Sequence, residues 1–172
     1  MPKQESHVIK EGCWTEVVRK MPIPCVDVIV SRDREFLMGW RKIPPYRNVW
    51  ALVGGRMIRG ESFAETSARH CKKSGLEVQS VRFLGVYPVK FPSRHDITMC
   101  MTAQWKKGTP LANDEFSRYR WFKNREVRDI RPVGANYRKM LKDWQAMNAI
   151  NRRSGRSHDI DCFGGTTVRR YV

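Results

Sequence analysis

The residues best suited to chemistry gather in one stretch, residues 54–76, which reads GGRMIRGESFAETSARHCKKSGL. A strand, a Gly-Gly loop at Gly54 and Gly55, and a helix are expected in that order. Such an arrangement exposes backbone amides at a helix N-terminus and suits phosphate. Lys72 and Lys73 add ammonium groups that can neutralise phosphate oxygens. The pattern therefore predicts a binding site for a phosphate-bearing ligand.

A capping box positions this stretch. Ser62 and Glu65 form the S-x-x-E pattern, in which each side chain bonds a backbone amide of the first helical turn. We expect a helix of about twelve residues from Phe63. Gly75 can adopt the left-handed conformation that ends it, and Leu76 can pack back beneath it.

The predicted helix has two faces. Its narrow buried face is expected to contain Phe63, Ala64, Ser67, Ala68 and Cys71. The opposite face carries Arg69, His70, Lys72 and Lys73. The alternative interpretation is that this basic face is simply a solvated helix surface.

Two acidic positions outside the helix are further candidates. Asp27 stands inside the apolar run CVDVIV, where an unpaired carboxylate is costly, so it is either functional or paired, for example with Arg41. Glu115 follows Asp114 in a polar loop, where a carboxylate can be a hard-cation ligand or a general base. A solvated acidic loop is the alternative for Glu115. His70 and His95 are weaker candidates for a base.

The remaining pattern predicts an α/β fold. Strands are expected at residues 25–30, 35–40, 49–52, 78–89, 96–105 and 119–122, with a turn at residues 106–108. Residues 135–148 are amphipathic and predict a helix that packs on the sheet. The order implies a mixed β-sheet between helices.

Charge and composition narrow the class of protein. The 172 residues include 33 Lys and Arg against 17 Asp and Glu, which gives a net charge of +16 and favours phosphate-bearing partners. The five cysteines have no paired metal spacing and predict reduced thiols. No apolar run approaches a membrane span and the start lacks a signal-peptide core, so we expect a cytoplasmic protein without a membrane partner.

The stretch resembles the Nudix box, G-x5-E-x7-R-E-U-x-E-E-x-G-U, where U is aliphatic. Gly55, Glu61 and Arg69 match its first three fixed positions. The acidic cluster is absent whichever way the box is aligned. Its three carboxylate positions hold His70, Lys73 and Ser74 counting forward from Arg69, or Arg69, Lys72 and Lys73 counting back from Gly75. Because an ammonium cannot polarise water as a metal ion does, lysines there predict binding better than turnover.

Further segments resemble the GDP-mannose mannosyl hydrolase branch of the Nudix superfamily. They are TEVVRKMPIPCVDVIV, EFLMGWR, NVWALVGGR, LGVY, YRWF and GANYRKML. The resemblance implies a Nudix fold, hydrolysis at the sugar carbon of a nucleotide sugar, and Mg²⁺ (or Mn²⁺). It implies metal ligands at the Gly54 carbonyl, Glu61 and Glu115, with Asp27 orienting the base. Phe116 stands where the branch has its histidine base.

The same resemblance assigns basic residues to the diphosphate. Arg41, Arg56 and Arg69 match arginines that surround it, and planar guanidinium groups suit bidentate phosphate contacts. Lys72 and Lys73 are grouped with them as substrate-binding residues. For Arg69 an ion pair with Glu61 or Glu65 is an equal alternative, and for Glu61 an architectural role is favoured.

Two functions follow from these patterns. The first is a Nudix-type hydrolase of a nucleoside diphosphate derivative, most like GDP-mannose, with a reduced metal site. The second is a catalytically silent Nudix domain that binds nucleotide or RNA, as part of a larger assembly. We expect a lead at residues 1–13, a Nudix domain at 14–146 and a basic tail at 147–172, with nucleic acid or a second copy of the chain as further partners.

Overall fold

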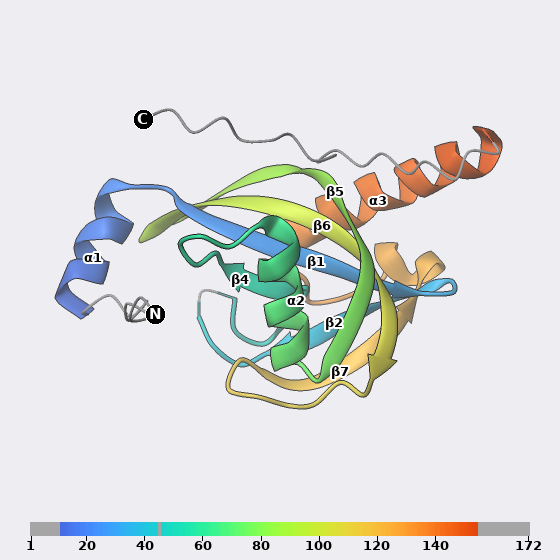
Figure 1. The fold of residues 1–172 in the computed structure, drawn as a ribbon, viewed down its shortest axis with the longest axis horizontal. Coiled ribbons are helices and arrows are strands. Elements are labelled where there is room, and N and C mark those ends of the chain that lie inside the picture. Colours follow the sequence, from blue (N-terminus) through green and yellow to red (C-terminus); the bar gives the residue numbers. More distant parts are fainter. Residues whose placement is uncertain (1–10, 45, 155–172) are drawn as a thin grey trace, which may run out of the picture.

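The computed structural model describes residues 11–44 and 46–154. The helical elements are α1 (Glu11–Lys20), α2 (Phe63–Lys73), the short 3₁₀ helix η1 (Asn124–Arg128) and α3 (Ala135–Ser154). The strands are β1 (Ile23–Arg32), β2 (Glu35–Arg41), β3 (Val49–Ala51), β4 (Val53–Arg56), β5 (Leu76–Phe91), β6 (Arg94–Gly108) and β7 (Phe116–Lys123). These elements form the expected mixed sheet with helices on both faces (Figure 1).

The sheet is organised around β1. The order is β3-β2-β1-β6-β5, with β4 paired to β1 and β7 paired to β2. β1 and β6 run parallel, from Ile23 opposite Asp96 to Ser31 opposite Gln104. The other pairs are antiparallel, and β5 and β6 form a long hairpin. This register brings the first residues of β6 beside the first residues of β1.

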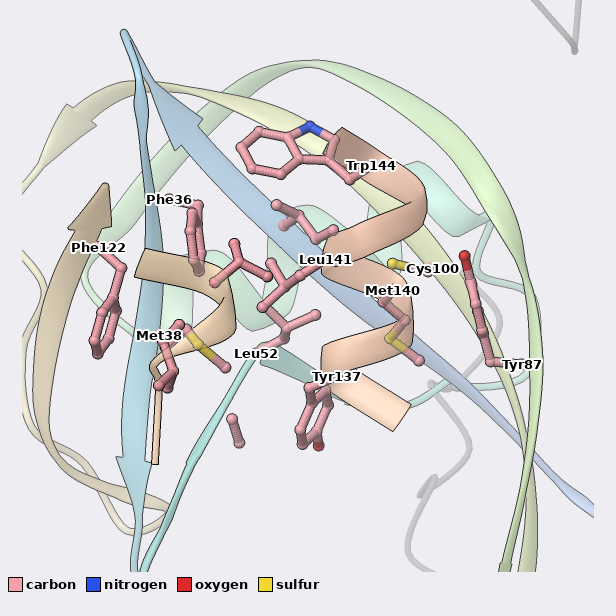
Figure 2. Packing of buried hydrophobic residues seen from close by; sticks show 14 of the residues in the cluster. Phe36, Met38, Leu52, Tyr87, Cys100, Phe122, Tyr137, Met140, Leu141 and Trp144 are labelled. Carbon is pink, nitrogen blue, oxygen red and sulfur yellow. The ribbon is translucent and has the colours of Figure 1, made fainter. Parts of the chain in front are cut away.

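Each face of the sheet has its own core. On one face α3 packs Met140, Leu141 and Trp144 against side chains that include Phe36 and Leu52 (Figure 2). On the other face α2 covers a cluster rich in valine and methionine, to which it contributes Cys71. Figure 1 shows α2 and α3 on opposite sides of the sheet, with α1 at one end. Alternating residues of β1 therefore serve two separate cores.

The box helix forms as its sequence predicts at both ends. Ser62 accepts a hydrogen bond from the amide of Glu65, and the Glu65 carboxylate accepts one from the amide of Ser62, so the capping box is confirmed. Gly75 follows the last turn with a φ of +79°. The predicted buried face is wrong in part. Ala64 and Ala68 are exposed, and the fully buried residues of α2 are Thr66, Ser67 and Cys71.

Other expectations need correction. Gly54 and Gly55 lie in strand β4, paired with Asp27 and Val26 of β1, so the predicted Gly-Gly loop with exposed amides is wrong. β6 continues through residues 106–108 instead of turning. α1 begins within the expected N-terminal lead, and α3 extends past residue 146 to Ser154. Most of the basic tail, from residue 155 onward, lies outside the described residues, as do residues 1–10.

Candidate functional site

A pocket lies beside the first turn of α3, where β1, β4 and β6 meet the loops that flank β2 and β7. Four predicted site residues line it, namely Asp27, Arg41, Gly54 and Glu115. Gly55, predicted only as part of the glycine pair and the Nudix box pattern, also lines it. Sequence reasoning missed the others, which are Cys25, Tyr46, Val89, Phe91, Arg94, Asp96, Thr98, Asn136 and Tyr137. The pocket therefore unites residues that are far apart in the chain.

Asp27 lines this pocket and is paired with Gly54 across strands β1 and β4. A methyl group at Gly54 would lie 2.2 Å from Asp27 Oδ1 and 2.3 Å from the carbonyl oxygen of Val26, so only glycine allows this approach. Burial raises the pKa of Asp27 to about 7; Arg41 opposes the rise, whereas Glu115 and Asp96 add to it. Asp27 is thus a carboxyl group that changes protonation near neutral pH.

Arg41 and Glu115 form an ion pair at the pocket wall, and each side chain is only 13% exposed. The guanidinium group also donates to the carbonyl oxygens of Ile43 and Pro44, both at 3.2 Å. All three guanidinium nitrogens of Arg41 therefore have partners. The alternative of Arg41 pairing with Asp27 gives way to pairing with Glu115.

The loop before β7 is held in place by Asn113. Its Oδ1 accepts hydrogen bonds from the amides of Glu115 and Phe116, both at 2.9 Å, which fixes the direction of Glu115. Its Nδ2 donates to the carbonyl oxygen of Lys73 and to Tyr119. Asn113 thereby ties this loop to the last turn of α2.

Ser74 completes that connection. Tyr119 donates to Ser74 Oγ at 2.9 Å, and Ser74 is 2% exposed. Counted forward from Arg69, Ser74 occupies one of the positions where the Nudix box pattern has a carboxylate. Here the position joins α2 to β7 by a neutral hydrogen bond.

Glu61 and Arg69 form the anchor at the start of α2. Arg69 donates to both carboxylate oxygens of Glu61, at 2.6 and 2.8 Å. The amide of Ile58 and the hydroxyl of Thr66 also donate to Glu61. The Arg69 hydrogen bonds are the main reason that the pKa of Glu61 falls to about 2. The architectural interpretation of Glu61 and the ion-pair interpretation of Arg69 both describe these contacts.

His70 packs against the glycine pair instead of facing solvent. A methyl group at Gly55 would lie 2.7 Å from its ring, and its Nε2 lies 3.3 Å from the carbonyl oxygen of Arg56. Burial lowers the pKa of His70 to about 4. The imidazole is therefore neutral at physiological pH, and His70 is half-buried instead of fully solvated.

The other predicted basic residues lie outside the pocket lining. Arg56 stacks on the ring of Trp14 in α1, with its guanidinium carbon 4.1 Å from the ring centroid. Lys73 pairs with Asp114 at 3.0 Å, and Lys72 is exposed on α2. The assignment of Arg56 to the diphosphate stays a prediction from the resemblance, and that of Lys72 and Lys73 stays a prediction from their charge.

Two further positions that bear on the identity of a base also lie outside the pocket lining. Phe116, at the position of the histidine base in the branch, is 1% exposed and packs against Gly39. His95 borders a groove near the end of α1. Of the predicted acids and bases, Asp27 and Glu115 are the ones that the pocket brings together.

The predicted ligands for a divalent cation do not form a metal site. Hard cations need several oxygen ligands with free lone pairs. Both oxygens of Glu61 are bonded by Arg69, and Glu115 is paired with Arg41. Over residues 11–44 and 46–154, His, Cys, Asp and Glu form no group of three that could hold a metal ion. The residues present therefore do not fit the Mg²⁺ or Mn²⁺ that the resemblance implies.

Comparison with known proteins defines the family. Residues 21–144 match the NUDIX domain, so the chain belongs to the NUDIX domain family. It is similar to the ADP-ribose pyrophosphatase of Methanocaldococcus jannaschii, with 28% identity over 126 residues, which cover 72% of this chain and 73% of that protein. It is also similar to the low-salt glycan biosynthesis protein Agl8 of Haloferax volcanii, with 25% identity over 46% of this chain and 51% of that protein.

Solved structures agree on the fold. The MutT protein of Methanosarcina mazei has a TM-score of 0.66 at 18% identity, covering 75% of this chain and 97% of that chain. The NUDIX domain of Shewanella oneidensis NrtR, crystallised with ADP ribose, has a TM-score of 0.64 at 16% identity, covering 81% and 99%. Within the described residues, no helix has the length and apolar character needed to cross a membrane. Contacts with nucleic acid or a second copy of the chain stay predictions.

Proposed function

We propose that this protein binds a nucleoside diphosphate derivative, in particular a nucleotide sugar such as GDP-mannose, without holding a divalent cation on the box helix. One observation carries the proposal. In neither alignment do the box positions that would be acidic hold an acid. Counted forward from Arg69 they hold His70, Lys73 and Ser74, each of which makes other contacts. Counted back from Gly75 they hold Arg69, Lys72 and Lys73. A box helix with these side chains can keep the shape of a Nudix site, although it lacks the carboxylates that would bind a divalent cation.

The comparisons support the class of ligand. The Methanocaldococcus jannaschii relative is named an ADP-ribose pyrophosphatase, and the Shewanella oneidensis domain was crystallised with ADP ribose. Both names describe a nucleoside diphosphate that carries a second sugar. GDP-mannose shares that architecture, and it is the ligand that the segment resemblance favours.

Hydrolysis at the sugar carbon is the second candidate, and Asp27 favours it. A general base works best when its pKa is near the operating pH, and the pKa of Asp27 is raised to about 7. The Asp27 carboxylate would take a proton from water as the water oxygen bonds to the sugar carbon. The bond from that carbon to the diphosphate oxygen would break, and its electron pair would leave with the diphosphate. Arg41 could offset the charge if it released Glu115.

A panel of nucleotide sugars and plain nucleoside diphosphates tests both candidates. Calorimetric binding and sugar release should each be measured with EDTA and with Mg²⁺. The binding proposal expects the same affinity under both conditions and no sugar release. Metal-independent release of free sugar and nucleoside diphosphate would favour hydrolysis through Asp27. Binding or turnover that requires Mg²⁺ would contradict the cation-free proposal.

A further inference from the structure

Asp96 is a buried carboxylate in the pocket that the chain leaves incompletely bonded. It is 4% exposed, at the start of β6. Its Oδ2 accepts a hydrogen bond from Arg94 Nη2 at 2.6 Å. Its Oδ1 is buried and has no hydrogen-bond partner among the residues that the structure describes. Asp96 therefore has one satisfied oxygen and one unsatisfied oxygen in a lining position.

Such an oxygen calls for a donor. The large majority of buried side-chain polar atoms in native proteins have a partner, and leaving a charged one without a partner is especially costly. Carboxylate oxygens accept hydrogen bonds only, so the missing group must carry an N–H or O–H. A ligand in this pocket can supply it, because Asp96 lines the same pocket as Asp27 and Gly54.

The surroundings of Asp96 disfavour phosphate as the partner. Asp27, Asp96 and Glu115 place three carboxyl groups in one pocket. The two arginines of the lining are already paired, Arg41 with Glu115 and Arg94 with Asp96. A second anion would meet repulsion from these carboxyl groups. Arg94 keeps its buried Nε without a hydrogen-bond partner among the described residues, but its charge is engaged by Asp96. A neutral hydrogen-bond donor avoids that repulsion.

The aromatic part of the lining suits a ring. Tyr46 lies with its ring centroid 5.1 Å from that of Phe91 and 5.6 Å from that of Tyr137. Asn136 Nδ2 lies 3.3 Å from the Tyr46 hydroxyl and adds polar groups to the same wall. A sugar has an apolar ring face and hydroxyl donors at its edge, so it matches both the aromatic wall and Asp96.

We propose that Asp96 determines specificity for the sugar beyond the diphosphate, because its Oδ1 accepts a hydrogen bond from a hydroxyl group of that sugar. This inference rests on the proposed function, since it assigns one end of the same ligand. The hydroxyl can belong to a ribose, as in ADP-ribose, or to a hexose, as in GDP-mannose.

Two matched ligand pairs test the proposal, GDP-mannose with GDP and ADP-ribose with ADP. Affinities of the full chain are measured by calorimetry in EDTA for the wild type, Asp96→Asn and Asp33→Asn. Asparagine keeps the shape of Asp96 but replaces one acceptor by a donor. Asp33 is the control, because it lies exposed in the turn between β1 and β2, away from the pocket lining.

Asp96→Asn should weaken binding of at least one sugar-bearing ligand about tenfold, the order of one charge-assisted hydrogen bond. Binding of the matching diphosphate should change less than about twofold, and Asp33→Asn should change neither. Whichever pair responds identifies the ribose or the hexose. An equal loss of affinity for a sugar-bearing ligand and its diphosphate would overturn the inference. A loss seen for both GDP and GDP-mannose, but not for the adenine ligands, would also overturn it, because it would place guanine at Asp96. If the wild type binds none of the four, the proposed function itself fails.

Ligand analogues provide a test that does not depend on folding of the variant. Wild-type protein is titrated with analogues that each lack one hydroxyl of the distal sugar. At least one analogue should bind about tenfold more weakly than its parent. Equal affinity for every analogue would overturn the role of Asp96 even if Asp96→Asn does not fold.

Discussion

The carboxylates of the box helix and those of the pocket differ in how fully they are hydrogen-bonded. At α2, Glu61 and Arg69 satisfy each other, and the backbone of Ile58 and the hydroxyl of Thr66 complete the arrangement. In the pocket, Asp96 keeps an unsatisfied oxygen and Asp27 has a raised pKa. Groups that satisfy each other stabilise a fold, whereas buried groups left incomplete are characteristic of binding sites. These contacts favour an architectural role for α2, and they support the proposal that the pocket recognises a ligand.

The largest effect on stability is expected from Gly54→Ala, a substitution in β4 at the pocket lining. The added methyl group would overlap Asp27 Oδ1 and the Val26 carbonyl, so the free energy of unfolding should fall by about 3 kcal/mol. Gly12→Ala is the matched control, since a methyl group at this helical position meets nothing within 4 Å and should stabilise α1 slightly. Chemical denaturation of both variants measures the difference. A neutral Gly54→Ala would mean that β4 does not approach Asp27 so closely.

The next prediction concerns the pH dependence of stability, which should have opposite signs for Asp27 in the pocket and His70 on α2. The folded pKa of Asp27 lies above its ordinary value of 3.8, so its contribution to stability is lost as pH rises from about 4 to about 7. The folded pKa of His70 lies below its ordinary value of 6.5, so its contribution is lost as pH falls from about 6.5 to about 4.

Variants at these two positions test the pH dependence. Asp27→Asn should therefore gain stability relative to the wild type at pH 8 compared with pH 4, by at least about 1 kcal/mol. His70→Gln should gain stability at pH 4 compared with pH 8. Denaturation curves of both variants across this range provide the measurement. Parallel pH profiles of a variant and the wild type would contradict the assignment for that residue.

A loss of stability is also expected from Glu61→Gln, because this substitution breaks the ion pair between Glu61 and Arg69 that holds the start of α2. The substitution removes the charge that binds Arg69 and should lower the free energy of unfolding by about 2 kcal/mol. Glu16→Gln is the control, because its pairs with Arg19 and Lys20 are exposed and should contribute less than about 0.5 kcal/mol. Nucleotide affinity should stay unchanged in both variants. A loss of affinity with little loss of stability would move Glu61 into the binding site.

The smallest effect is expected from Ser62→Ala. Removing the cap hydroxyl leaves the Glu65 amide without its side-chain partner and should cost about 1 kcal/mol of stability. Thermal unfolding with unchanged ligand affinity is the expected result. A helix that begins elsewhere in the variant without loss of stability would contradict the capping assignment.

Short sequence patterns correctly predicted those structural features that depend on residues close together in the chain. The capping box, the end of α2 at Gly75 and the strands around Asp27 follow from short-range rules. β4 was missed because glycines have little strand preference, and only pairing with β1 makes Gly54 and Gly55 extended. Their strand is a product of tertiary structure.

The site was predictable only in part for a similar reason. Resemblance identified Asp27, Arg41 and Glu115, which the pocket brings together. Asp96 begins a strand that was expected, but its burial beside β1 depends on the parallel register of β1 and β6. The tether from Asn113 to the end of α2 likewise joins residues 40 positions apart. Contacts at such separations leave no pattern in a single sequence.

Binding of Mn²⁺ to the nucleotide-free protein, followed by electron paramagnetic resonance, tests the central claim most directly. The engaged carboxylates of Glu61 and Glu115 predict that the spectrum of free Mn²⁺ persists when the wild-type protein is added in excess. Loss of the free-ion signal in the wild type, together with its return in Glu115→Gln, would contradict the claim and restore a metal site.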